Sequence, residues 1–190
     1  MIESKLGERV FSTPDIQQRV QEVAHHISAD YSGKRPLLIS ILRGAAYFTM
    51  DLTRHLTIPF DLDFMSLSSF KTGFKKIEID KDVSEEMANR DVLIVEDIID
   101  TGLTLNFLFR VMEKRFPASI AACTFLDCPE RRFIEVPVKY SCFKIPDIFV
   151  VGYGLDFRGD YRNLMEVSTL FDPSGRSTQI LKQMGKGGTK

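Results

Sequence analysis

The stretch 92–105, VLIVEDIIDTGLTL, joins an apolar run to a group of acidic, hydroxyl and glycine residues. Six of its first eight residues are apolar, which is typical of a strand covered on both faces of a sheet. Two adjacent carboxylates, Glu96 and Asp97, interrupt the run, and the sequence DTGLT follows at 100–104. We expect a strand over VLIVE, a tight turn, and then a helix over about 103–116.

This order of strand, turn and helix recurs along the chain. Apolar runs predict further strands at residues 36–42, near 60–64, at 119–126 and at 148–152. Amphipathic periodicity predicts helices at 14–30 and 45–56, the first capped by Thr13 with Pro14 in its first turn. Strands that alternate with helices at these spacings predict an α/β fold, with a mainly parallel sheet flanked by helices.

Composition narrows the possible partners. The chain has 190 residues, 44% hydrophobic and 27% charged, as expected for a single globular domain. A net charge of −1 argues against sequence-independent binding to nucleic acid. No apolar run reaches the ~20 residues that cross a bilayer, and the first residues do not resemble a secretory leader. The three cysteines lack zinc-site spacing, so we expect a cytoplasmic protein with no membrane partner.

The turn at 100–104 suits a sugar phosphate. Ligands of open α/β sheets bind beyond the carboxyl ends of the strands, and a helix N-terminus offers its unpaired N–H groups to a phosphate. Glu96 and Asp97 would repel a phosphate in contact, but one sugar ring away they suit ribose hydroxyls or a Mg²⁺ ion. From the residues alone, a merely solvated turn stays open. So does the Asp-Thr-Gly of aspartic proteases, although those pair two such aspartates on an all-β scaffold.

Over about residues 36–165 the chain also resembles a known family. VLIVEDIIDTGLTL is similar to the phosphoribosyl pyrophosphate motif of type I phosphoribosyltransferases, and the whole looks like their hypoxanthine-guanine branch. Three more segments follow the family's order: LRG (42–44) resembles its first pyrophosphate loop, LSSFKTG (67–73) its mobile loop, and IPDIFVVGYGLDFRGDYRNL (145–164) its purine and pyrophosphate segment. The resemblance implies transfer of a 5-phosphoribosyl group from phosphoribosyl pyrophosphate to a purine nitrogen, with release of pyrophosphate.

The resemblance assigns roles on the phosphate side. It implies a phosphoribosyl site made of Glu96, Asp97, Asp100, Thr101, Gly102, Leu103 and Thr104. Pyrophosphate would be held by Leu42, Arg43, Gly44, Ser69, Phe70 and Arg162. Asp156, with Glu96 and Asp97, would hold Mg²⁺. Asp100 would be catalytic and manage the proton on purine N7, whereas the residues alone leave open that it is a helix cap.

On the base side the sequence departs from the family. Phe149 resembles the aromatic that stacks on the purine, although a core phenylalanine is the alternative, and Val150 and Asp156 would lie beside it. The family has a lysine for the purine 6-oxo group where this chain has Cys128, and a thiol is a weak donor. Either Cys128 serves the base, or it packs behind the turn while a backbone N–H, a water or Arg131 does so. Phe70 likewise replaces a tyrosine.

These readings lead to one functional hypothesis and one alternative. We expect a purine salvage phosphoribosyltransferase that uses Mg²⁺ and makes a purine nucleoside monophosphate from hypoxanthine or guanine. The alternative is a non-catalytic or altered-specificity protein that binds nucleotides or phosphoribosyl pyrophosphate on the same fold. The resemblance also implies a homodimer or homotetramer. It implies one domain over 1–190, with a core over about 36–152, a hood from 1–35 and 153–182, and a disordered end at 185–190.

Overall fold

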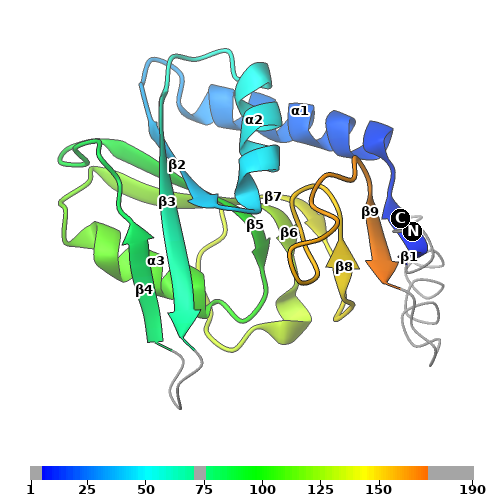
Figure 1. The fold of residues 1–190 in the computed structure, drawn as a ribbon. Helices are drawn as coiled ribbons and strands as arrows, with labels where there is room; N and C mark the ends of the chain where they lie inside the picture. The colour runs from blue at the N-terminus through cyan, green and yellow to red at the C-terminus, as the bar shows by residue number, and fades with distance from the viewer. Residues whose placement is uncertain (1–5, 71–75, 171–190) are drawn as a thin grey trace.

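A computed structural model describes residues 6–70 and 76–170, and shows two sheets (Figure 1). The larger has six strands in the order β4-β3-β2-β5-β6-β7, parallel except for the antiparallel hairpin β3–β4. The smaller has three antiparallel strands in the order β1-β9-β8. The α/β class with a mainly parallel sheet, predicted from the sequence, is confirmed.

The elements have the following bounds. The larger sheet contains β2 (Leu37–Leu42), β3 (Asp61–Phe70), β4 (Lys76–Lys81), β5 (Asp91–Ile99), β6 (Ser119–Asp127) and β7 (Tyr140–Lys144). The smaller sheet contains β1 (Leu6–Phe11), β8 (Val150–Val151) and β9 (Val167–Leu170). The helices are α1 (Thr13–Asp30), α2 (Ala45–His55), α3 (Leu103–Glu113) and the short 3₁₀ turn η2 (Pro129–Arg131). Among the described residues, no helix is both long and apolar enough to cross a membrane.

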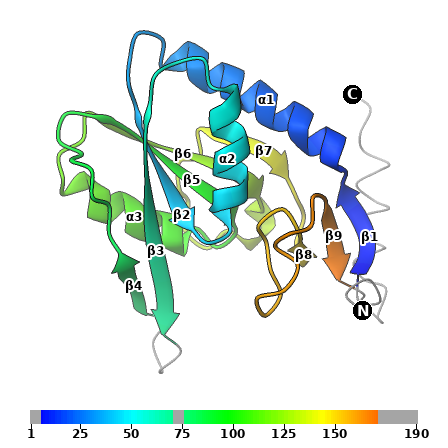
Figure 2. The ribbon, with the colours of Figure 1, turned by 45° about the horizontal axis from the view of Figure 1, so that its top comes forward.

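Alternate residues of the central strands bury into two separate cores. On β2 and β5, Leu38 and Leu93 pack with side chains of α1 and α2. Their neighbours Leu37 and Val92 pack with side chains of α3 on the other face. Figure 2 shows the same layers, with α1 and α2 on one side of the larger sheet and α3 on the other. Double coverage explains why these strands are apolar without interruption.

Two expectations about elements were wrong. The run 148–152 is not a fifth parallel strand of the core, because β8 pairs antiparallel with β9 in the smaller sheet. The cap of α1 is Ser12 and not Thr13, because the Ser12 hydroxyl accepts from the Asp15 N–H and the Asp15 carboxylate accepts from the Ser12 N–H, the two halves of a capping box.

The smaller sheet joins the two ends of the described chain. Leu6 of β1 pairs with Leu170 of β9. Helix α1 falls inside the range expected for the hood, yet Ile16, Val20 and Ile27 pack into the core beside Leu38. The expected end of the hood at 171–182 and the expected disordered end at 185–190 lie outside the described residues.

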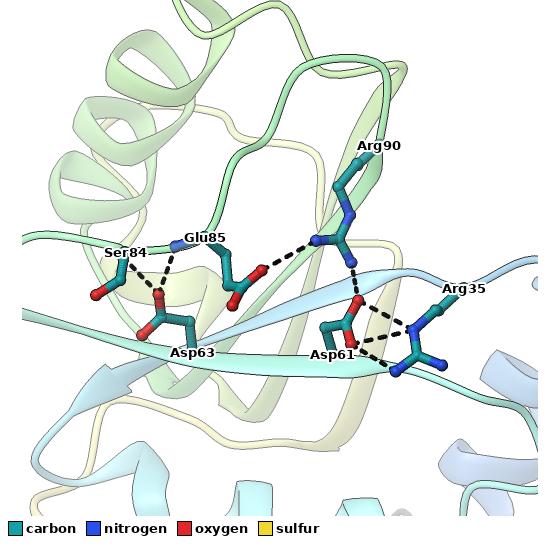
Figure 3. Close-up of polar contacts among 6 residues, drawn as sticks. All are labelled: Arg35, Asp61, Asp63, Ser84, Glu85 and Arg90. Atoms are coloured by element: carbon teal, nitrogen blue, oxygen red, sulfur yellow. Dashed lines mark hydrogen bonds and ion pairs between the residues drawn. The ribbon is translucent and has the colours of Figure 1, made fainter.

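The start of β3 is tied to the segment that follows β4 (Figure 3). Asp63 Oδ2 accepts from the backbone N–H groups of Ser84 at 2.6 Å and Glu85 at 3.0 Å. Asp61 pairs with Arg35 and with Arg90, and Arg90 also reaches Glu85. These contacts tie the start of β3 to the segments that precede β2 and β5 and to the segment that follows β4.

Candidate active site

Strand β5 has two adjacent carboxylates near its carboxyl end, Glu96 and Asp97. Glu96 is buried, and burial raises its pKa well above the ordinary value, with the charges of Asp97 and Asp100 adding to the rise. Burial also raises the pKa of Asp97 to about 6, although the Ile98 N–H and the positive charge of Arg162 oppose it. Unneutralised buried carboxylates of this kind favour a cation or a set of hydroxyl donors beside them.

The turn after β5 places backbone N–H groups at the start of α3. Gly102 is the N-cap of α3 with a φ of 80°, and a Cβ there would lie 2.3 Å from the Ile134 carbonyl oxygen. The Thr101 carbonyl accepts from the N–H groups of Phe133 and Ile134, so a neighbouring segment holds the turn. A cavity of about 20 Å³ opens here, lined by Glu96, Ile98, Ile99, Asp100, Gly102, Thr104 and Leu105. Leu103 and Thr104 are exposed beside it.

Asp100 lies at the mouth of this turn and is not a helix cap. Gly102 holds the N-cap position, and no side chain caps α3. One carboxylate oxygen of Asp100 accepts from the Thr101 N–H at 2.6 Å, and the other lies 3.6 Å from Arg131 Nη2. Its side chain is 40% exposed, so it can reach a ligand. The capping alternative left open by the sequence is therefore wrong.

The loop after β2 touches the carboxylate end of β5. A Cβ on Gly44 would lie 1.6 Å from Asp97 Oδ2, so only glycine lets the two segments approach this closely. The peptide bond between Leu42 and Arg43 is cis, and the Arg43 side chain is exposed. A cavity of about 310 Å³ joins this loop to the turn; it is lined by Ile41, Leu42, Leu67, Ser68, Ile77, Glu96, Asp97, Ile98, Asp100 and Thr104.

The segment after β8 brings a second pair of charges. Arg162 forms an ion pair with Asp156 at 2.5 Å and donates to the Gly154 carbonyl oxygen at 2.5 Å. A Cβ on Gly154 would lie 2.2 Å from the carbonyl oxygen of Gly44, so this segment packs directly on the loop after β2. Three stretches distant in sequence thus meet around Asp97.

Beside the turn after β5 lies a third cavity, of about 230 Å³. It is lined by Asp97, Ile98, Asp100, Arg131, Ile148, Phe149, Val150, Leu155 and Asp156. Phe149 is 52% exposed, which excludes the core-phenylalanine alternative, and its ring meets that of Phe157 edge-on at 5.8 Å. A flat cavity wall of this kind suits stacking on an aromatic ligand.

Cys128 is not among the residues that line this cavity. Its side chain is 1% exposed, and the thiol donates to the Pro146 carbonyl oxygen at 3.4 Å. Burial raises the pKa of the thiol. The geometry matches the alternative in which Cys128 packs behind the turn, while Arg131 faces the cavity.

The structure describes the expected mobile loop only in part. Ser69 and Phe70 end β3, where their backbones pair with Ile77 and Lys76. The rest of the expected mobile loop, residues 71–73, lies outside the described residues. Ile98 lines all three cavities, yet the sequence did not single it out, because an apolar residue inside an apolar strand carries no signal of a site.

The donor set fits a hard cation that is shared with a substrate. Within the described ranges, no three histidine, cysteine, aspartate or glutamate side chains are grouped to hold a metal by themselves. Mg²⁺ usually takes one or two carboxylates and completes its shell with substrate phosphates and water. The oxygen donors of Asp97 and Asp156, which lie near enough for each charge to act on the other, fit that pattern.

Comparison with known proteins gives a consistent result. Residues 7–158 match the family model described as a phosphoribosyl transferase domain. The chain is 39% identical over 173 residues to a hypoxanthine-guanine phosphoribosyltransferase of Streptococcus pneumoniae, covering 90% of this chain and 96% of that protein. It is 43% identical over 155 residues to a hypoxanthine phosphoribosyltransferase of Salmonella typhimurium, covering 79% of this chain and 87% of that protein.

Solved structures agree. A hypoxanthine phosphoribosyltransferase from Staphylococcus aureus superposes with a TM-score of 0.86 at 38% identity, covering 93% of this chain and 97% of that one. A hypoxanthine-guanine phosphoribosyltransferase from Bacillus anthracis gives a TM-score of 0.84 at 37% identity, covering 88% of this chain and 99% of that one.

Proposed function

This chain belongs to the phosphoribosyltransferase family, and we propose that it works in purine salvage, transferring 5-phosphoribosyl from phosphoribosyl pyrophosphate to hypoxanthine or guanine. One observation supports this most strongly. Asp97, Ile98 and Asp100 line both the cavity of about 310 Å³ at the loop after β2 and the cavity of about 230 Å³ beside Phe149. Two adjoining cavities suit a two-substrate transfer, with the ribose carbon at their junction.

The leaving group is pyrophosphate. When the bond from ribose C1 to the pyrophosphate oxygen breaks, positive charge grows on the sugar and negative charge on the leaving group. We assign pyrophosphate to the backbone of Leu42–Gly44 and to the charges of Arg43 and Arg162. We also assign Ser69 and Phe70 to the pyrophosphate site. Bound Mg²⁺ would supply further neutralisation of the phosphate oxygens.

The ribose lies between the two cavities in this proposal. Glu96 and Asp97 accept hydrogen bonds from its hydroxyls, which compensates for the burial of the two carboxylates. The phosphate on C5 lies against the turn, where Thr101, Gly102, Leu103 and Thr104 supply N–H and hydroxyl donors. In this proposal every residue from 101 to 104 contacts the phosphate.

The purine occupies the cavity beside Phe149. Its N9 lone pair forms the new bond to ribose C1, and the proton on N7 passes to Asp100, which keeps the product neutral at the ring. Phe149 stacks on the ring, and the backbone of Val150 borders it. In the reverse direction Asp100 returns the proton.

Several finer properties are part of the same proposal. The partners are phosphoribosyl pyrophosphate, a purine base, a purine nucleoside monophosphate and pyrophosphate. The metal is Mg²⁺, held by Asp156 with Glu96 and Asp97. We also propose a homodimer or homotetramer working in the cytoplasm, and sedimentation of the purified chain tests its assembly.

Pyrophosphate release, measured with a panel of purines and pyrimidines, tests the activity. We expect release that depends on both phosphoribosyl pyrophosphate and a 6-oxopurine. Tight binding of phosphoribosyl pyrophosphate with no release for any base would favour the alternative, a binding protein on the same fold.

A further inference from the structure

The guanidinium of Arg131 lines the cavity beside Phe149. Arg131 ends η2, and within the described part of the chain it is the one basic residue among those that line this cavity. The other polar side chains that line it are the carboxylates of Asp97, Asp100 and Asp156. A base placed against Phe149 would therefore find carboxylate acceptors in this cavity, and its side-chain donor would be the guanidinium of Arg131.

The donors of Arg131 are available to a ligand. Its guanidinium lies 3.6 Å from Asp100 Oδ2 and 3.6 Å from Asp147 Oδ1. Both distances exceed that of a hydrogen bond, so the side chain is attracted to these carboxylates without being saturated by them. The side chain is 43% exposed. The neighbouring Arg132 is different, because it is 8% exposed and is paired with Asp127 below the turn.

Neither polar group of Cys128 can take this role. The thiol donates to Pro146, and the backbone N–H donates to the Ile99 carbonyl oxygen at 2.9 Å. These two hydrogen bonds instead hold the residue before η2 to the last residue of β5 and to the segment that follows β7. Glu130 adds a third contact, since its carboxylate accepts from the Asp147 N–H at 3.1 Å. The turn is thus held in a way that directs Arg131 at the cavity.

The chemistry of Arg131 selects among purines. Hypoxanthine and guanine present an acceptor oxygen at C6 beside N7, whereas adenine presents an amino donor there. Arginine has only donors, so it binds the oxygen and meets the amino group donor to donor. Asp100 beside it accepts the N7 proton, and the two side chains together match the adjacent O6 and N7–H of a 6-oxopurine.

We propose that Arg131 reads the purine 6-oxygen and gives this protein its preference for 6-oxopurines, an inference that rests on the proposed function. Hydrogen bonds to a charged group contribute about 1.5–3 kcal/mol, which corresponds to roughly ten- to a hundredfold in affinity. That is enough to separate inosine and guanosine monophosphates from adenosine monophosphate.

The test measures binding and turnover separately. Inosine, guanosine and adenosine monophosphates are titrated calorimetrically into wild type, Arg131→Gln and Arg131→Lys, with Arg110→Gln, an exposed arginine of α3, as the matched control. We expect Arg131→Gln to weaken inosine and guanosine monophosphates by roughly ten- to a hundredfold and to leave adenosine monophosphate little changed. Arg131→Lys should restore part of the difference, and Arg110→Gln should behave as wild type.

Turnover with hypoxanthine and adenine completes the design. In Arg131→Gln, KM for hypoxanthine should rise while KM for phosphoribosyl pyrophosphate stays constant. An equal loss for all three nucleotides, or no loss, overturns the role of Arg131, and transfer by wild type would then leave the proposed function standing. If wild type transfers to no base yet binds inosine monophosphate through Arg131, the proposed function fails and the role in base reading stands.

Discussion

At the scale of single residues, Asp100 lies where three cavities meet, because it lines the small cavity at the turn after β5, the cavity at the loop after β2 and the cavity beside Phe149. Its carboxylate does not cap α3, and we propose that it accepts the purine proton. Asp100→Asn should lower kcat by about 10²–10⁴ while phosphoribosyl pyrophosphate still binds, because the amide keeps the shape and loses the basicity. Steady-state kinetics with a parallel binding titration check this. A kcat close to that of wild type would remove Asp100 from the proton-transfer step.

The carboxylates near the carboxyl end of β5, together with Asp156, lead to a prediction about metal. Glu96, Asp97 and Asp156 offer oxygen ligands, which suit Mg²⁺ or Mn²⁺ better than Zn²⁺. Activity should vanish in a chelator and return on addition of Mg²⁺, measured as pyrophosphate release. Thermal unfolding in the same buffers is the control, since the folded chain should not need the metal. Full turnover after rigorous removal of metal would contradict the assignment.

Cys128 leads to the complementary prediction to Arg131. Because its thiol only donates to Pro146 inside the protein, Cys128→Ala should lower the free energy of unfolding by roughly 1 kcal/mol through the lost hydrogen bond and packing. The preference for hypoxanthine over adenine should stay the same. Denaturant unfolding and the ratio of kcat/KM for the two bases measure the two effects. A selective loss of hypoxanthine would mean that the thiol reads the base after all.

At the scale of elements, Asp63 holds the segment after β4 to the start of β3 (Figure 3). Partial burial acts to raise its pKa, but the backbone N–H groups of Phe64, Glu85 and Ser84, with Lys81, outweigh burial and lower it. A lowered carboxyl pKa stabilises the fold above the unfolded value of about 3.9, and that stability is lost as the pH falls through the folded value.

Asp63→Asn should therefore cost about 1–3 kcal/mol of unfolding free energy at neutral pH and flatten its decline below pH 4. Denaturant unfolding across a pH series measures both. Glu86→Gln, an exposed carboxylate in the same segment, is the control and should follow wild type. Parallel pH curves for wild type and Asp63→Asn would show that these bonds contribute no net stability.

The elements that the sequence predicted are those whose pattern is local. Strands β2, β5 and β6 are buried on both faces, so their apolar runs show them directly. Strands β1, β7 and β9 lack such a run: β1 and β9 pair across almost the whole described chain, and β7 lies at the edge of the larger sheet. Residues 148–152 misled for the same reason, since an apolar run does not say which sheet it joins.

The site divides in the same way. The proposed phosphate side could be predicted because it comes from one continuous motif, VLIVEDIIDTGLTL. The carboxylates and the glycine of this motif lie along the end of β5 and the turn into α3. The base side depends on which side chain of a turn faces a cavity, and Cys128 and Arg131 differ in that respect only after folding. A sequence pattern carries no information on such an orientation.

At the scale of the whole molecule, aromatic rings join the smaller sheet to the larger one. Phe11 of β1 stacks on Phe143 of β7 with ring centroids 4.0 Å apart, and Phe143 meets Phe125 edge-on at 5.7 Å. Phe125 in turn packs at 4.7 Å on Tyr153, whose hydroxyl donates to Asp51 of α2. The segment with Asp156 and Arg162 follows Tyr153, so this chain of rings supports one wall of the site.

Phe11→Ala should loosen that wall. We expect a loss of about 2 kcal/mol in unfolding free energy, because the ring is partly buried and stacked. KM for phosphoribosyl pyrophosphate should rise more than KM for the base, since Arg162 lies on the affected side. Phe133→Ala is the control, because that ring is 80% exposed. Unchanged stability and kinetics in Phe11→Ala would mean that the smaller sheet is held by other contacts.

The central claim is that two adjoining cavities, which share Asp97 and Asp100, bind two substrates between which a 5-phosphoribosyl group is transferred. The most direct test incubates the purified chain with phosphoribosyl pyrophosphate, Mg²⁺ and hypoxanthine, and quantifies inosine monophosphate and pyrophosphate together by mass spectrometry. The account predicts equimolar formation of both products, dependent on each substrate and greatly reduced in Asp100→Asn. Pyrophosphate without nucleotide, or neither product while both substrates bind, would contradict it.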